Sequence, residues 1–208
     1  MTITLAIVIV IAIGVLVYTN LPYSNQTSDD TSDMDTTDEN EQNENDETLL
    51  TIIHKGINYT YSISELENIE PYTAPGRYIK TKLLPDTVIL GDTHNYTGVT
   101  IQSLLDDVNV SSNFYQLNIS ASDGWITTYS INDTIGKVDV YDETGQIIDN
   151  ASATMIIAYK EDRKYYSTID LDNEIGPLRI AFVGENTPIT PSNLWAKMIT
   201  TIEVIYLS

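Results

Sequence analysis

Arg179 is the first residue whose position suggests chemistry, because it is a cation inside an apolar segment. Residues 174–184 read EIGPLRIAFVG, a Gly-Pro turn followed by a strand-like run. The chain has 10 lysines and arginines against 30 aspartates and glutamates, so each cation is notable. A buried guanidinium without a partner is costly, so we expect Arg179 to pair with a carboxylate such as Glu203 or Asp123. In the alternative interpretation, Arg179 and Lys197 face one pocket and hold an anion together.

Asp123 and Gly124 form a second candidate feature, a tight turn between two strand-like runs. The stretch SASDGWITTYS ends one strand at this turn and begins the next at Trp125. Asp-Gly is typical of hairpin turns because both residues tolerate positive φ. We therefore expect a hairpin here, with Trp125 packed beside the turn.

The chain lacks the residues that several common catalytic mechanisms require. It contains no cysteine, which removes disulfides, thiolate metal ligands, iron–sulfur clusters and cysteine nucleophiles. No H-E-x-x-H motif, glycine-rich phosphate loop or G-x-S-x-G motif occurs. His54 and His94 stand in unrelated contexts, so we expect strand or surface histidines rather than metal ligands. The net charge of −20 argues against nucleic acid as a partner, because phosphate binding requires a basic surface.

The elements that would position these residues are mostly strands. Residues 115–121 alternate apolar and polar side chains, the period of a half-buried strand. The pattern also predicts one hairpin over residues 51–63 and a second over residues 153–169. A final strand is predicted over residues 201–207. The first hairpin would turn near Gly56 and the second around residues 161–163.

Two short helices are expected among these strands. Ser64 followed by Glu67 matches a capping box. Residues 98–108 place four apolar side chains on one helical face after a possible Thr100 cap. These elements together predict the α+β class, mostly β.

Composition divides the chain into three segments. Residues 1–20 hold an apolar run from Ile3 to Tyr18 and predict a transmembrane anchor, or alternatively a cleaved signal segment. Residues 21–48 are acidic and nearly free of apolar side chains, which predicts a disordered linker. Residues 49–208 predict the folded domain.

Asparagine sequons give a second indication of location. Seven N-x-S/T sequences are candidates for glycosylation, at Asn25, Asn58, Asn95, Asn109, Asn118, Asn132 and Asn150. The alternative is a sequence that is simply rich in threonine and asparagine. Together with the predicted anchor, the sequons favour a single-pass protein of the cell membrane, with its domain outside the cytoplasm.

The order of several short motifs resembles a known family. The motifs are Gly98-Val99, the Leu104-Leu105 helix, Asp123-Gly124-Trp125, GPLR at 176–179, WAK at 195–197 and IEV at 202–204. Over roughly residues 50–206 this order looks like the oxidoreductase molybdopterin-binding domain family, which has the sulfite-oxidase-type fold. The resemblance implies that fold for the domain, preceded by the predicted transmembrane helix and disordered linker.

The resemblance also implies cofactor-binding positions. Those that match the family's motifs are Asp123, Gly124, Gly176, Arg179 and Lys197. Members with sulfite-oxidase activity hold molybdenum through a cysteine thiolate, which this chain lacks. We therefore expect no catalytic residue, no metal site and no cofactor, although the resemblance allows bound molybdopterin.

The predicted function is non-catalytic binding of a small-molecule ligand or a partner protein, by a membrane-anchored domain of this fold. One alternative is a molybdopterin-dependent oxidoreductase or electron-transfer subunit, which predicts a deep pocket holding Arg179, Lys197 and the Asp123-Gly124 turn together. A further alternative is a structural cell-surface glycoprotein, which predicts no pocket.

The missing cysteine makes metal content the first testable prediction. Protein purified from its own source should contain far less than one molybdenum or tungsten atom per chain, because no thiolate is available to hold the metal. Elemental mass spectrometry of the purified protein measures this. One molybdenum or tungsten atom per chain would contradict the binding-domain interpretation.

Overall fold

The computed structural model describes residues 47–81, 87–111, 114–169 and 174–207. Strands dominate these ranges and the helices are short, in agreement with the predicted mostly-β α+β class. The predicted anchor and residues 21–46 of the predicted linker lie outside the described ranges. Among the helices that are described, none has the length and apolar character needed to cross a bilayer.

One sheet joins the first described strand of the domain to the last. Its strand order is β2 (Ile57–Tyr61), β1 (Leu50–His54), β12 (Ile199–Tyr206), β6 (Tyr115–Ala121) and β7 (Ile126–Ser130). The β1–β12 pair is parallel, and the other neighbours are antiparallel. Burial alternates along β6 with period 2, so the strand predicted over residues 115–121 is confirmed.

The second sheet carries the strand that contains Arg179. Its order is β10 (Arg179–Val183), β8 (Thr154–Glu161), β5 (His94–Thr100), β3 (Pro71–Thr81) and β11 (Ile189–Pro191), with β4 (Val88–Leu90) on β3 and β9 (Lys164–Tyr165) on β8. Strand β10 is an edge strand, yet all five of its residues are buried. Its outer side is covered by the segment before β12, where the Ile180 amide donates to the Ala196 carbonyl over 2.8 Å.

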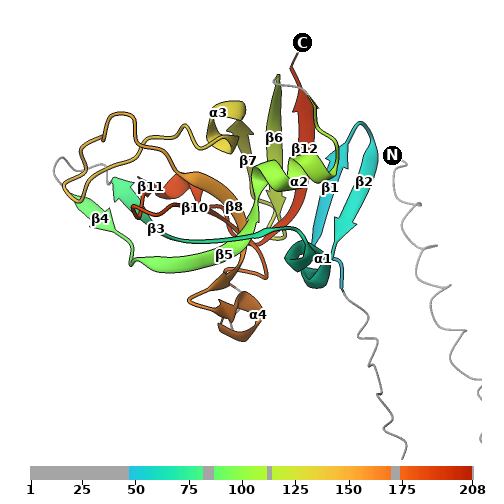
Figure 1. Cartoon of the computed structure of the whole chain (residues 1–208), viewed down its shortest axis with the longest axis horizontal. Coiled ribbons are helices and arrows are strands. Elements are labelled where there is room, and N and C mark those ends of the chain that lie inside the picture. Colours follow the sequence, from blue (N-terminus) through green and yellow to red (C-terminus); the bar gives the residue numbers. More distant parts are fainter. Residues whose placement is uncertain (1–46, 82–86, 112–113, 170–173, 208) are drawn as a thin grey trace, which may run out of the picture. The chain divides into compact units, whose positions relative to one another are not determined.

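Short helices lie in the connections between strands. They are α1 (Ile63–Asn68), α2 (Ile101–Asp107), α3 (Ile131–Thr134), α4 (Tyr166–Ile169) and the 3-10 turn η1 (Ser192–Leu194). Helices α1 and α3 contact strands of both sheets (Figure 1). The Thr100 side chain caps α2 by accepting from the Ser103 amide, as predicted.

Two of the predicted elements are wrong in detail. The α1 capping box is formed by Ser62 and Glu65, not by Ser64 and Glu67. Both pairs have the three-residue spacing, and the helix begins one residue before Ser64. The predicted 153–169 hairpin has a second strand of only two residues, because α4 follows β9 directly.

Trp125 and β3 also differ from expectation. The Asp123-Gly124 turn does join β6 to β7, with the Asp123 side chain accepting from the Trp125 amide. Trp125 does not pack beside it, since the residue is 65% exposed. Strand β3 was not predicted, because Pro75 and Gly76 interrupt its sequence. The pairing with β5 nevertheless includes Pro75 and ends at Gly76.

The backbone of β8 lies so close to Gly98 that no side chain fits at this position. A substitution at Gly98 should therefore lower the stability of the protein. A Cβ at this position would lie 2.0 Å from the Ile157 carbonyl oxygen. Gly98→Ala should therefore reduce the free energy of unfolding by about 1–3 kcal/mol, the usual cost of overpacking. Urea unfolding of the full chain, followed by tryptophan fluorescence, measures the change.

Gly184→Ala provides the matched control. Its added Cβ would meet only Pro188 ring carbons at 3.5 and 3.6 Å, an ordinary contact. Equal stabilities of the two variants would contradict the close packing of β5 on β8.

Candidate functional site

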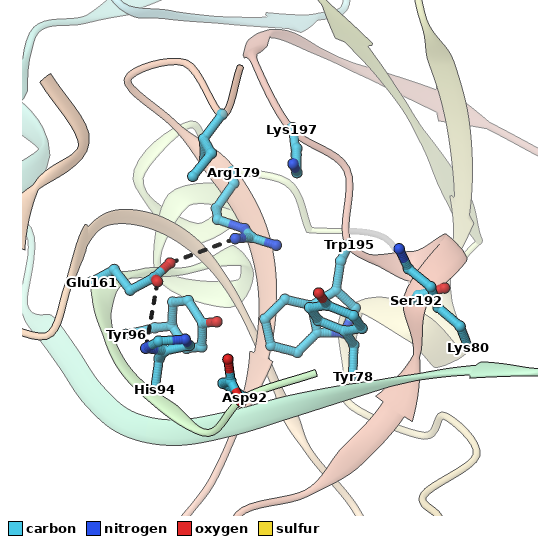
Figure 2. A pocket seen from close by; sticks show the side chains of 11 residues that line it. Tyr78, Lys80, Asp92, His94, Tyr96, Glu161, Arg179, Ser192, Trp195 and Lys197 are labelled. Carbon is cyan, nitrogen blue, oxygen red and sulfur yellow. Dashed lines mark ion pairs between the residues drawn. The ribbon is translucent and has the colours of Figure 1, made fainter. Parts of the chain in front are cut away.

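A pocket of about 340 Å³ opens beside the start of β10. Its walls come from β3, β5, β8, β10 and the segment that contains η1 and Trp195. The side chains that line it are those of Tyr78, Lys80, Asp92, His94, Tyr96, Glu161, Ile175, Arg179, Ser192, Trp195 and Lys197. Figure 2 shows Arg179 and Lys197 on one side of this space, and Asp92 and His94 on the other.

The backbone around Gly176 holds Arg179 and Lys197 in place. The Met198 amide donates to the Ile175 carbonyl over 2.6 Å, and the Ile199 amide donates to the Leu178 carbonyl over 3.1 Å. Gly176 has a φ of 72°, and a Cβ there would lie 2.7 Å from the Met198 Cα. Glycine is therefore required where the turn before β10 crosses the segment before β12.

Arg179 is buried and paired with a carboxylate. Its side chain is 7% exposed, and its Nη1 lies 3.6 Å from Glu161 Oε2. The same carboxylate oxygen accepts a hydrogen bond from the Tyr166 hydroxyl over 3.2 Å. The prediction of a structural carboxylate partner is thus right in kind, but the partner is Glu161 and not Glu203 or Asp123.

Two aromatic rings complete the surroundings of the Arg179 guanidinium. Its Cζ lies 5.6 Å from the Tyr96 ring centroid and 5.3 Å from the Trp195 ring centroid. A desolvated cation over such rings gains cation–π energy. Arg179 Nε is buried and has no hydrogen-bond partner among the described residues, so ring contacts and the Glu161 charge must offset its lost hydration.

His94 extends this charge network to the pocket rim. Its Nδ1 lies 2.7 Å from Asp162 Oδ2 and 3.5 Å from Glu161 Oε1. The hydrogen bond to His94 lowers the pKa of Asp162, and the Asn95 amide acts in the same direction. Glu161 and Asp162 are thereby engaged by groups of the protein itself.

Trp195 forms the aromatic wall of the pocket. Its ring meets Tyr96 and Tyr78 edge-on, with centroids 5.2 and 5.8 Å away. Its Nε1 donates to Thr190 over 2.8 Å, which fixes the ring orientation. Burial raises the pKa of Tyr96 well above its ordinary value, although the Arg179 charge opposes this, so the wall stays uncharged at neutral pH.

Lys80 and Lys197 are the exposed cations of the pocket. Lys80 Nζ lies 5.6 Å from the Tyr78 ring centroid. In the described part of the chain, neither ammonium group has a carboxylate within ion-pair distance. Both charges are therefore available to an anionic ligand.

The residues predicted to bind a cofactor are only partly brought together. Arg179 and Lys197 line the pocket, and Gly176 supports the backbone behind them. Asp123 and Gly124 lie at the β6–β7 turn and do not line it, although the Ser122 amide donates to the Met198 carbonyl next to Lys197. Their role as cofactor ligands stays a prediction.

Sequence reasoning missed most of the remaining pocket residues. Glu161 and Asp92 reach the pocket through the pairing of β3, β5 and β8, which no local motif encodes. His94, expected as a strand or surface histidine, begins β5 and lines the pocket. The isolated tyrosines and Lys80 carried no spacing signal either.

The glycosylation candidates lie mostly at exposed positions. Asn25 falls outside the described residues. Exposed asparagines are Asn58, Asn95, Asn109, Asn132 and Asn150. Asn118 is half-buried in β6, and its side-chain oxygen accepts from Thr128. Their modification stays a prediction.

The donor set does not fit a thiolate-held molybdenum centre. The whole chain lacks cysteine, and in the described ranges no group of three or more His, Asp or Glu side chains is arranged to hold a metal ion. His94 and Glu161 line the pocket but are engaged by Asp162 and Arg179, and the remaining charged groups are mostly cations.

Comparisons with known proteins support the fold. No family model and no curated protein sequence matches the chain. Among solved structures, the sulfane dehydrogenase SoxCD from Paracoccus pantotrophus matches with a TM-score of 0.50 and 13% sequence identity. The match covers 75% of this chain and 37% of that chain, so this chain spans little more than a third of its neighbour's length. At this identity the likeness shows a shared fold, and nothing finer.

The buried ion pair generates a stability prediction. Glu161→Gln should lower the free energy of unfolding by about 3 kcal/mol, because it leaves the buried Arg179 charge without its counter-ion. Glu143→Gln is the matched control, since Glu143 is 79% exposed in its 3.2 Å pair with Arg77 and should cost less than about 1 kcal/mol. Urea unfolding measures both variants, and equal effects would contradict a structural role for the Arg179–Glu161 pair.

Proposed function

We propose that this chain is a non-catalytic binding domain of sulfite-oxidase-type fold whose pocket takes a small organic molecule with an anionic group. One observation carries the proposal. Three of the chain's 10 lysines and arginines, Lys80, Arg179 and Lys197, line a single aromatic-walled pocket in a protein of net charge −20. Arg179 is paired with Glu161, so the exposed Lys80 and Lys197 are the cations that can attract an anionic ligand.

The pocket favours binding over the oxidoreductase alternative. That alternative requires Arg179, Lys197 and the Asp123-Gly124 turn in one deep pocket, and the turn does not line this one. It also requires a metal centre, for which the chain has no thiolate. The sulfane dehydrogenase activity of the structural neighbour is a property of that protein, and 13% identity gives no reason to transfer it.

The pocket also weighs against a purely structural surface protein, which would need none. Its volume is at the lower end of the range of ligand pockets, roughly 300–1,000 Å³. An aromatic wall with a few convergent charged groups is the common composition of such sites. A small ligand therefore suits it better than a macromolecular partner.

The location of the domain remains part of the proposal. The apolar run over residues 3–18 supports a membrane anchor, and the acidic stretch over residues 21–48 supports a tether. Such an arrangement would hold the pocket outside the cytoplasm at a distance from the membrane.

Ligand titration tests the proposed function. Calorimetry of the detergent-solubilised full chain should show benzoate binding at the pocket, and benzylamine should bind much more weakly. Lys197→Gln should weaken benzoate about 10-fold, the effect of losing one charge-assisted hydrogen bond of about 1.4 kcal/mol.

Lys137→Gln is the control for general electrostatics. Lys137 is exposed and does not line the pocket, so its replacement removes the same charge without changing the site. Equal losses for both variants, or no binding of benzoate to the unmodified chain, would contradict the proposal.

A further inference from the structure

The charged groups of the pocket fall into two classes, those engaged by the protein and those left for a ligand. Arg179, Glu161, His94 and Asp162 form one connected network. A ligand gains little from these groups because their charges already compensate one another.

Asp92 belongs to the second class. It is exposed, lines the pocket, and has no cation within ion-pair distance among the described residues. Lys80 and Lys197 are likewise without carboxylate partners. The pocket thus presents uncompensated charges of both signs to whatever occupies it.

These opposite charges lie apart. Figure 2 shows Asp92 beside His94 and Lys197 on the far side of Arg179, with Tyr78 and Trp195 bordering the space between them. A ligand with a carboxylate alone would satisfy Lys197 and leave Asp92 without a partner. A ligand with a separated ammonium group would satisfy both ends and place its apolar middle against the aromatic wall.

We infer that the ligand is a small zwitterion, with its carboxylate and ammonium groups separated by a short apolar or aromatic spacer. The carboxylate lies toward Lys197, and the ammonium lies toward Asp92. The pocket volume of about 340 Å³ limits the ligand to the size of an amino-substituted aromatic acid, an ω-amino acid or a small dipeptide. This inference rests on the proposed function, because it assigns a ligand class to the same pocket.

Asp92 acts in this arrangement as a specificity-determining residue. It attracts the correct ligand and repels dianions such as sulfate and phosphate, so discrimination comes from both effects. Lys197 supplies attraction to every carboxylate, with or without an ammonium group. The two residues should therefore have separable effects on affinity.

Three compounds with the same aromatic ring test the inference by calorimetry on the full chain. They are para-(aminomethyl)benzoate, benzoate and benzylamine, which carry both charged groups, the carboxylate alone and the ammonium alone. The zwitterion should bind about 10-fold more tightly than benzoate, because it adds one charge-assisted contact. Asp92→Asn should abolish that advantage while leaving benzoate affinity unchanged or slightly higher.

Asp106→Asn is the matched control, since Asp106 is exposed at the end of α2 and does not line the pocket. It should preserve the preference for the zwitterion. If benzoate binds but the ammonium group adds nothing, or if the preference survives Asp92→Asn, the inference is wrong and the proposed function stands. If neither benzoate nor the zwitterion binds, the proposed function fails and the inference fails with it.

Discussion

The burial of Arg179 is the constraint on which the pocket depends. A guanidinium removed from water needs a counter-ion and further favourable contacts, and here Glu161, Tyr96 and Trp195 provide them. These three residues come from β8, β5 and the segment before β12, so one side chain ties three parts of the domain together. The same arrangement places the Trp195 ring as a wall and leaves Lys197, two residues later, exposed at the pocket.

Whether a charged side chain of the pocket is paired within the protein depends on how deeply it is buried. Arg179 lies deep enough that it must be neutralised by the protein, and Glu161 is held by both Arg179 and Tyr166. Lys80, Asp92 and Lys197 are exposed, and water hydrates them when no ligand is present. Under the proposed function, recognition by these exposed charges would require little change in the buried network, so the pocket would be formed before a ligand binds.

Local patterns in the sequence predicted individual strands and helices. The pairing of strands that are distant in the sequence determines which residues line the pocket. Alternation in residues 115–121 and the Thr100 cap identify β6 and α2, because the signal lies within a few residues. The partner of Arg179 was expected to be a carboxylate, but Glu161 reaches it through the β8–β10 pairing, which the sequence does not state. The same limit explains why Asp92 was missed. The fold likeness to a sulfane dehydrogenase concerns the arrangement of the chain and, at 13% identity, says nothing of the pocket chemistry.

Nuclear magnetic resonance of the arginine side chains tests the central claim most directly. Arg77, Arg163 and Arg179 are the arginines of the chain, so each Nε–H group gives one signal. The Arg179 signal, assigned by its loss in Arg179→Lys, should be displaced by the neighbouring rings and exchange slowly with water, because its Nε is buried. It should also shift when benzoate is added. An Arg179 signal that exchanges as rapidly as that of the exposed Arg163, and does not shift when benzoate is added, would contradict a buried arginine at a binding pocket.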